Sequence, residues 1–169
     1  MSNLLKYKFC PICGRPLKKK SIEHKQRLIC GACDFVFYQN SKPCVAAIIM
    51  RGKEILLTKR AIAPFKGYWD TPGGFLEEGE APEVGMKREL MEELGLRCRI
   101  ASLFGIFMDT YGKSGDHILN LYYIVEALGS PKHAVDDIDD YAFFPLTKLP
   151  KKLAFHSARV VLKRLSTER

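Results

Sequence analysis

The sequence has no apolar run approaching the roughly 18 residues that a membrane-spanning helix needs. Its beginning, MSNLLKYKFCPIC, lacks the apolar segment of a secretory signal peptide. No internal repeat or low-complexity tract is present, which excludes solenoid and fibrous proteins. The four histidines show no paired spacing of the kind that metal sites use. We therefore expect a cytoplasmic protein with no membrane partner.

The length and the charge of the chain favour two unequal parts. A chain of 169 residues can hold one good core and a small appendage. The net charge is +8, and residues 1–40 carry eight Lys or Arg against two Asp or Glu, whereas residues 41–169 carry nineteen against seventeen. A basic first segment could meet nucleic acid or an anionic substrate. The alternative is a solubilising surface without a partner.

Four of the six cysteines have the spacing of a metal site. Cys10, Cys13, Cys30 and Cys33 form the pattern C-x2-C-x16-C-x2-C, which predicts two ligand turns joined by a hairpin around a structural zinc ion. A disulfide framework is the weaker alternative in a cytoplasmic chain. About forty residues bury little core, so the ion would supply the missing folding free energy.

Turn residues and hydrophobic patterns divide the chain. The polar segment 40–43 marks a boundary, so we expect a zinc ribbon over residues 1–40 and a second domain over residues 41–169. The second domain is predicted to contain strands and helices in the following order: strands 44–50 and 54–60 joined by a turn, a loop at 61–68, a helix at about 81–94, strands 98–109 and 118–127 joined by the polar loop TYGKSGDH, a short strand at 141–144, and a last helix at about 154–166. Strands mixed with a central and a terminal helix indicate an α/β fold, a sheet flanked by helices.

The predicted helix 81–94 gathers three carboxylates on one side. Glu89, Glu92 and Glu93 fall within an arc of roughly 100°, with Arg88 at its edge. The other side carries Val84, Leu90, Met91 and Leu94 and is predicted to pack inward. Like charges three and four residues apart destabilise a helix. A hard divalent cation such as Mg²⁺ or Mn²⁺ among the carboxylates would remove that cost, whereas a solvated acidic face is the alternative.

The same stretch, GFLEEGEAPEVGMKRELMEELGL, resembles the signature of the Nudix family. Every fixed position of the pattern G-x5-E-x7-R-E-U-x-E-E-x-G-U, in which U is aliphatic, is matched by Gly74, Glu80, Arg88, Glu89, Leu90, Glu92, Glu93, Gly95 and Leu96. The resemblance implies an α/β/α sandwich with a mixed sheet. It also implies a hydrolase that cleaves the diphosphate linkage of nucleoside diphosphate derivatives with a divalent metal. With the zinc ribbon in front, the chain looks like a group that includes NADH diphosphatases and FAD pyrophosphatase-like proteins.

The resemblance implies a role for each residue of the box. Glu92 and Glu93 are the expected ligands of Mg²⁺ or Mn²⁺, Glu89 is a ligand or orients one, and the carbonyl of Gly74 completes the coordination. Arg88 is expected to pair with Glu80, so that both support the site structurally.

The general base is expected in the acidic loop VDDIDDYAFFPL. Asp137 is the first candidate, followed by Asp136, Asp139 and Asp140. Family members often have glutamate there, and the other options are that Glu89 or Glu93 acts as the base.

Basic and aromatic residues are candidates for substrate binding. Arg60, at the end of the second predicted strand, suits bidentate contact with phosphate. Aromatic rings that could stack on a base are Tyr38, Phe65, Tyr68, Trp69 and Tyr111. Tyr111 lies near the position where, in the family, a tyrosine suggests a dinucleoside polyphosphate substrate.

The substrate is less sharply indicated. The chain lacks the Ser-Gln-Pro-Trp motif that marks NADH diphosphatases, and Gly112 stands in the region where ADP-ribose enzymes often have proline. We expect a substrate related to ADP-ribose or to NADH and FAD, with AMP and a phosphorylated remainder as products. Two alternatives are a nucleic-acid-binding regulator or decapping-like protein that uses the basic ribbon, and a ribbon that serves folding or homodimer formation only. The intact box favours an enzyme.

Overall fold

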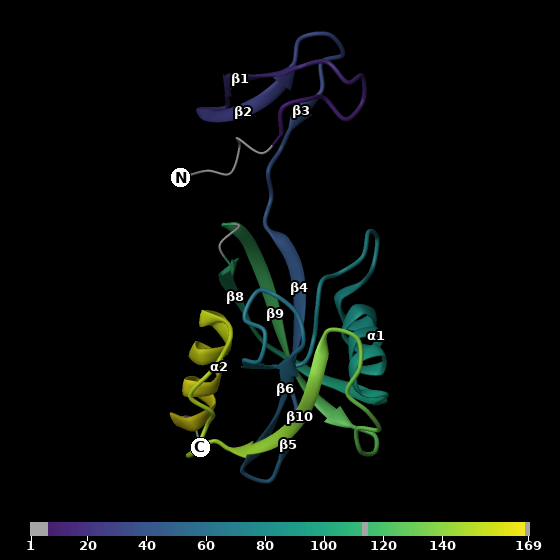
Figure 1. Cartoon of the computed structure of the whole chain (residues 1–169), viewed down its shortest axis with the longest axis vertical. Helices are drawn as coiled ribbons and strands as arrows, with labels where there is room; N and C mark the ends of the chain where they lie inside the picture. The colour runs from purple at the N-terminus through teal and green to yellow at the C-terminus, as the bar shows by residue number, and fades with distance from the viewer. Residues whose placement is uncertain (1–6, 113–114, 168–169) are drawn as a thin grey trace. The chain divides into compact units, whose positions relative to one another are not determined.

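The computed structural model describes residues 7–112 and 115–167 (Figure 1). The chain divides into two compact units, with the boundary between Ser41 and Lys42. Neither of the two helices in the described ranges is long and apolar enough to cross a membrane. Lys113 and Ser114, in the predicted polar loop, lie outside the described residues.

The first unit is a small antiparallel sheet in the order β1-β2-β3, formed by Leu17–Ile22, Lys25–Cys30 and Val36–Phe37. The hairpin between β1 and β2 turns through Glu23 and His24, whose φ angles are 51° and 62°. Two successive positive φ values in a two-residue loop match the twist of paired strands. This hairpin connects the two cysteine pairs, as predicted.

The second unit contains a mixed sheet in the order β4-β9-β8, formed by Lys42–Ile48, Asp116–Ala127 and Cys98–Tyr111. Strand β4 runs parallel to β9, and β8 runs antiparallel to β9. A second sheet pairs β6 (Glu54–Arg60) antiparallel with β10 (Ile138–Pro145), with β5 (Met50–Arg51) and with β7 (Trp69–Asp70). The predicted strand 54–60 matches β6, and the predicted mixed sheet is confirmed.

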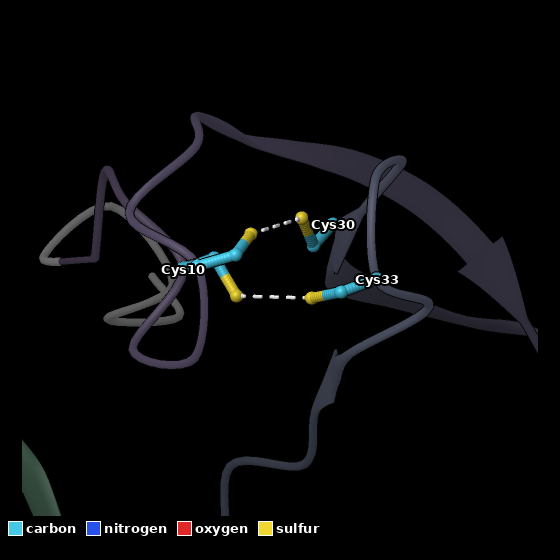
Figure 2. Close-up of side chains that lie close together, drawn as sticks. Cys10, Cys30 and Cys33 are labelled. Carbon is cyan, nitrogen blue, oxygen red and sulfur yellow. Dashed lines mark hydrogen bonds between the residues drawn. The ribbon is translucent and has the colours of Figure 1, made fainter.

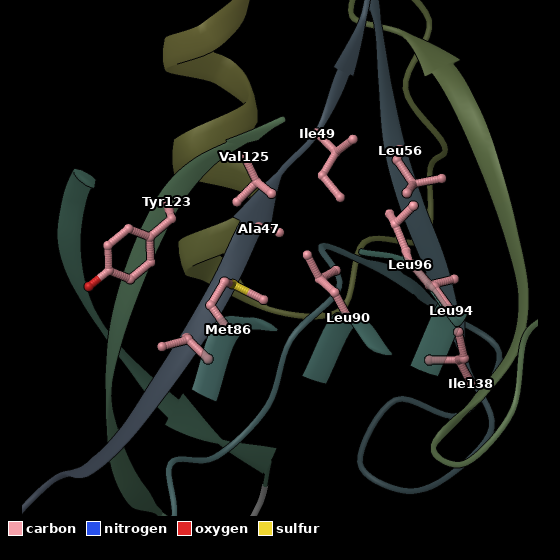
Figure 3. Close-up of a cluster of buried hydrophobic side chains, with 11 residues drawn as sticks. Ala47, Ile49, Leu56, Met86, Leu90, Leu94, Leu96, Tyr123, Val125 and Ile138 are labelled. Atoms are coloured by element: carbon pink, nitrogen blue, oxygen red, sulfur yellow. The ribbon is translucent and has the colours of Figure 1, made fainter. Parts of the chain in front are cut away.

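The two helices cover opposite faces of the sheets (Figure 1). Helix α1 (Pro82–Leu94) packs on the face of β4 that carries Val45 and Ala47, and on Ile49 directly after that strand, as Figure 3 shows for most of this core. Helix α2 (His156–Thr167) packs on the other face, which carries Ala46 and Ile48. Because successive strand residues point to opposite faces, this arrangement is an α/β/α sandwich, as expected.

The buried face of α1 differs from the prediction. Met86, Leu90 and Leu94 are fully buried, but Val84 and Met91 are 58% and 44% exposed. At 100° per residue, Met91 lies roughly 60° beyond Leu94, outside the buried arc. The buried arc instead extends in the other direction to Glu93, which is 5% exposed. The acidic and apolar sides of the helix therefore meet at Glu93.

Candidate active site

One cavity of about 330 Å³ is lined by residues of both helices, of five strands (β4, β6, β7, β8 and β9) and of the loops before α1 and β10. Its lining includes the candidates Arg60, Gly74, Glu89, Glu92, Glu93, Tyr111, Asp136 and Asp137. The other candidates do not line it: Tyr38, Phe65, Tyr68, Trp69, Asp139 and Asp140. Residues more than 70 positions apart thus converge because β4, β9 and α1 meet here.

Arg88 links helix α1 to the loop that precedes it. Its Nε and one terminal nitrogen donate to the two oxygens of Glu80 at 2.8 and 2.9 Å. Its other terminal nitrogen donates to Glu89 and Glu92, each at 2.8 Å. Arg88 also donates to the carbonyl of Phe75 at 3.0 Å. The pairing of Arg88 with Glu80 that the resemblance implies is therefore present, and the same guanidinium reduces the repulsion between Glu89 and Glu92.

This network makes a testable prediction about pH. The hydrogen bonds from Arg88 and from the backbone of Glu77 lower the pKa of Glu80 from 4.5 to about 2. A depressed carboxyl pKa stabilises the fold above the unfolded-state pKa, and this contribution is lost as the pH falls from 4.5 toward 2. The Glu80→Gln variant should therefore be less stable than wild type by a constant margin above pH 5, and the margin should shrink below pH 4.5.

Urea unfolding followed by the fluorescence of Trp69, the single tryptophan, measures this margin. The matched control is Glu78→Gln in the same loop, where the side chain is exposed, and it should show no such pH-dependent margin. A Glu80→Gln margin that does not change with pH would contradict this account of the pair.

Gly73, just before the box, and Gly74, its first position, make different close contacts. Gly73 has a φ of 141°, and a Cβ there would lie 2.1 Å from the carbonyl oxygen of Val45. A Cβ on Gly74 would lie 2.5 Å from the carboxylate of Glu89. The carbonyl of Gly74 accepts a hydrogen bond from the N–H of Val45 at 2.9 Å, and a carbonyl oxygen has a second lone pair. A side chain at Gly73 would therefore collide with the backbone of β4, and one at Gly74 would displace the carboxylate of Glu89.

Glu93 is a buried carboxylate with few groups that stabilise its negative charge. The N–H of Gly73 donates to its Oε2 at 3.1 Å, and no cationic side chain in the described part of the chain pairs with it. Burial raises the pKa of Glu93 well above its ordinary value, and the charge of Glu89 raises it further. Burial also raises the pKa of Glu89, although Arg88 opposes that effect. The ionised form of Glu93 thus lacks a positive partner.

The charge of the cavity fits a bound cation. Seven carboxylates line it against the guanidinium groups of Arg60 and Arg88: those of Asp70, Glu77, Glu89, Glu92, Glu93, Asp136 and Asp137. Among the described side chains, the four cysteines form the group whose ligand atoms all lie within 4.8 Å of one another. The carboxylates of the box do not form such a group and so do not converge on one point. Oxygen donors with excess negative charge nevertheless suit a hard divalent cation that retains several waters.

Strand β10 begins at Ile138, so Asp139 and Asp140 lie in that strand and only Asp136 and Asp137 precede it. Two of these four aspartates reach the cavity. Asp136 and Asp137 line it, whereas Asp139 and Asp140 do not. Asp137 is close enough to Glu93 to raise its pKa electrostatically, and the carbonyl of Asp137 accepts a hydrogen bond from Ala61 at 2.8 Å. This placement favours Asp137 or Asp136 over the two later aspartates.

Asp70 is a lining residue that the sequence reasoning missed. Burial raises its pKa to about 7, and the charge of Arg60 opposes that shift. Asp70 reaches the cavity because β7 pairs with β6, which places Thr58 opposite Asp70. The available signal was an aspartate directly before the turn Thr71-Pro72-Gly73, but a two-residue strand has no readable periodicity.

Three aromatic rings form one wall of the cavity. The rings of Tyr111 and Phe155 lie 5.8 Å apart at 21°, and Phe75 is 5.5 Å from Tyr111. Arg60 lies over Phe155 at 5.2 Å, and its Nε donates to the carbonyl of Pro64 at 2.8 Å. Tyr111 and Arg60 thus stand together, beside Phe75 and Phe155, which the sequence analysis did not single out.

In the first unit, the four cysteine sulfurs converge (Figure 2). The Sγ atoms of Cys10 and Cys33 are 3.5 Å apart, and so are those of Cys13 and Cys30. All four cysteines are free thiols. Four sulfur donors at these separations fit tetrahedral zinc and leave no position open, as a structural site requires.

Each of the two units matches a known protein family. The NUDIX domain family matches residues 40–165, and the family described as Nudix N-terminal, a zinc ribbon, matches residues 8–39. The ADP-ribose pyrophosphatase of Methanocaldococcus jannaschii is 36% identical over 124 residues, which are 73% of this chain and 73% of that protein. The NAD-capped RNA hydrolase NudC of Pseudomonas entomophila is 30% identical over 145 residues, 85% of this chain, and this chain spans half the length of that relative.

The fold is also found in a solved structure. A crystal structure of a Nudix hydrolase from Nitrosomonas europaea superposes with a TM-score of 0.83 at 30% identity. The match covers 96% of this chain and 92% of that one.

Proposed function

Because this chain belongs to the Nudix hydrolase family, we propose that its cavity binds Mg²⁺ or Mn²⁺ and hydrolyses the diphosphate linkage of ADP-ribose and related dinucleotides. The products would be AMP and a phosphorylated remainder, which is ribose 5-phosphate for ADP-ribose. The relative that shares 73% coverage in both directions is named for ADP-ribose, which makes this compound the first choice.

The observation that carries this proposal is the imbalance of charge in the cavity. A diphosphate is itself anionic, so seven carboxylates would repel it unless cations lay between them. Divalent cations in such a site polarise phosphoryl oxygens and lower the pKa of bound water. An acidic lining therefore suits an anionic substrate only if the site works with metal.

The chain's own residues would divide the remaining work. Glu89, Glu92, Glu93 and the carbonyl of Gly74 are the proposed ligand set, and the N–H of Gly73 orients Glu93. In the reaction, the oxygen of water forms a bond to one phosphorus while the anhydride bond from that phosphorus to the bridging oxygen breaks. Asp137 is proposed to accept the proton of the attacking water, and the leaving phosphate takes up the negative charge.

The direct test is a panel of ADP-ribose, NADH, FAD and NAD-capped RNA, assayed with Mg²⁺ or Mn²⁺ in ¹⁸O-labelled water. We expect metal-dependent release of AMP from ADP-ribose, NADH and FAD and of nicotinamide mononucleotide from NAD-capped RNA. One of the two products should carry one labelled oxygen, and kcat/KM should be highest on ADP-ribose. The position of the label identifies the phosphorus that water attacks. Absence of turnover on every compound with either metal would refute the proposal.

The aromatic wall makes a separate prediction for Tyr111. Its ring is expected to stack on the substrate's base or to hold Phe155 and Phe75 in place for that purpose. Stacking contributes about 1–3 kcal/mol per base, so Tyr111→Ala should raise KM for ADP-ribose by about tenfold or more. The kcat should change little, because the ring does not act on the phosphates.

Steady-state kinetics at saturating Mg²⁺ measure this split, and Tyr111→Phe, which keeps the ring, is the matched control. A Tyr111→Ala variant that loses kcat at unchanged KM would show that the ring has a different role.

A further inference from the structure

The sheet of the ribbon has the strand order β1-β2-β3 (Figure 1). The register of its strands places four cationic residues on one face. Side chains of directly opposed residues share a face of a sheet, and alternate residues along a strand share it too. The register pairs Lys20 with Arg27 and Ile22 with Lys25, and Lys18 lies two residues before Lys20. The four cationic residues on this side of the sheet, together with Tyr38, are called here the basic face: Lys18, Lys20, Lys25, Arg27 and Tyr38.

Tyr38 belongs to this face by the same register. Leu28 pairs with Phe37, so Tyr38, one residue further along, stands beside Arg27. The guanidinium carbon of Arg27 lies 4.3 Å from the centre of the Tyr38 ring, and Tyr38 is 49% exposed. An aromatic ring held by a guanidinium presents a flat, accessible surface next to positive charge.

The opposite face of the sheet is the inner one. Leu28 and Cys30 are 4% and 1% exposed there, and Phe37 contacts Tyr7 with ring centres 4.5 Å apart. Lys19 pairs with Leu28 and so points away from the basic face, although it is adjacent to Lys18 and Lys20 in the chain. Lys19 is therefore a control for the basic face, because it has the same charge and nearly the same place in the chain but points to the other side of the sheet.

Arg27 has an unmet hydrogen-bonding capacity. Its side chain is 17% exposed, and its Nε is buried without a hydrogen-bond partner among the described residues. Its nearest acid is Glu23, 3.9 Å from a terminal nitrogen and itself 75% exposed. A buried donor without an acceptor costs free energy. The terminal nitrogens of the same guanidinium would donate charge-assisted hydrogen bonds to an oxyanion.

We propose that the basic face of the ribbon binds single-stranded nucleic acid, with phosphates along Lys18, Lys20, Lys25 and Arg27 and a base stacked on Tyr38. Proteins bind single strands by combining cations that follow the backbone with aromatic rings that take the bases. An anionic membrane would use the cations but has no group that stacks on Tyr38. The proposal rests on the ribbon's own residues and stands whether or not the cavity hydrolyses ADP-ribose.

The test is the binding of a fluorescein-labelled single-stranded RNA of about 12 nucleotides to the full-length, zinc-loaded protein, followed by anisotropy. Four phosphate contacts predict that the logarithm of the binding constant falls with the logarithm of salt concentration with a slope of about −2.8. Lys20→Gln should weaken binding and reduce the slope by about 0.7. The matched control Lys19→Gln should leave the slope unchanged and alter the affinity less than about twofold.

The aromatic contact is tested independently of charge. Tyr38→Ala should weaken RNA binding by about fivefold or more at an unchanged salt slope, and Tyr38→Phe should restore it. Zinc content and turnover of ADP-ribose should be unchanged in all four variants, so a failure of RNA binding is distinguishable from a failure of the hydrolase proposal.

Three results would overturn the proposal. The first is no RNA binding even at about 50 mM salt. The second is an equal effect of Lys19→Gln and Lys20→Gln, which would show diffuse attraction without a defined face. The third is binding that depends on Lys20 and Tyr38 for phosphatidylcholine vesicles containing about one-third phosphatidylglycerol but not for RNA, which would assign the face to a membrane.

Discussion

The Glu93→Gln variant should lose at least about a thousandfold in kcat, or about 4 kcal/mol of transition-state stabilisation, while its fold is retained. Glutamine keeps an oxygen that can accept the hydrogen bond from Gly73, but it removes the negative charge that would hold a cation. Since Glu93 is buried and its pKa is raised by burial, the neutral replacement should not lower the free energy of unfolding. A variant that is inactive and at least as stable is the expected result.

The matched control is Glu83→Gln, the same change on the same helix. Glu83 lies outside the cavity lining and accepts a hydrogen bond from the hydroxyl of Tyr123 at 3.3 Å. This control should retain turnover within about threefold, since it is remote from the proposed ligands. If Glu93→Gln turned over ADP-ribose at a rate comparable to wild type, Glu93 would not be a catalytic ligand. If it unfolded, its role would be structural.

The second large effect is expected at the zinc site. Cys30→Ser should reduce bound zinc from one ion per chain to nearly none, because a structural site needs all four thiolates. None of the three buried apolar clusters contains a described residue of the ribbon, so this unit has little core of its own. Structural zinc supplies about 10–16 kcal/mol to such small units. Loss of the ion should therefore unfold the ribbon.

Hydrogen exchange on the full-length variant measures this outcome unit by unit. We expect protection to be lost in β1 and β2 and retained in β4 and β9, which belong to the larger unit with its own cores. The control is Cys98→Ser, because Cys98 lies outside the cysteine cluster and should leave zinc content unchanged. Undiminished protection of the ribbon in zinc-free Cys30→Ser would contradict a folding role for the ion.

Local sequence patterns predict much of the fold. Strand β6 matches its predicted limits. Helix α1 ends at Leu94 and is followed by Gly95, whose φ of 57° is left-handed, as the sequence predicts for a glycine after a helix. The strands on either side of the polar loop are longer than predicted, since β8 extends to Tyr111 and β9 begins at Asp116. Cross-strand pairing in a hairpin extends strands into polar sequence, and a window of residue types does not show that pairing.

The site residues that belong to a local sequence pattern were predictable. Those that tertiary contacts bring to the site were not. The box identifies Glu89, Glu92 and Glu93 on one helix, and helical spacing places them together. Burial of Glu93, by contrast, depends on which way α1 rotates against the sheet. Asp70 reaches the cavity because β7 pairs with β6, and Phe155 reaches it through the packing of the chain before α2. Neither contact produces a periodic pattern in the sequence.

The central claim is that this acidic cavity holds divalent cations that allow a diphosphate to bind. The direct measurement is a titration of zinc-loaded protein with Mn²⁺, followed by electron paramagnetic resonance, with and without a non-hydrolysable methylene analogue of ADP-ribose. We predict Mn²⁺ binding that tightens when the analogue is present and that is lost in Glu93→Gln. Absence of bound Mn²⁺ with the analogue in the cavity, or binding that persists unchanged in Glu93→Gln, would contradict the claim.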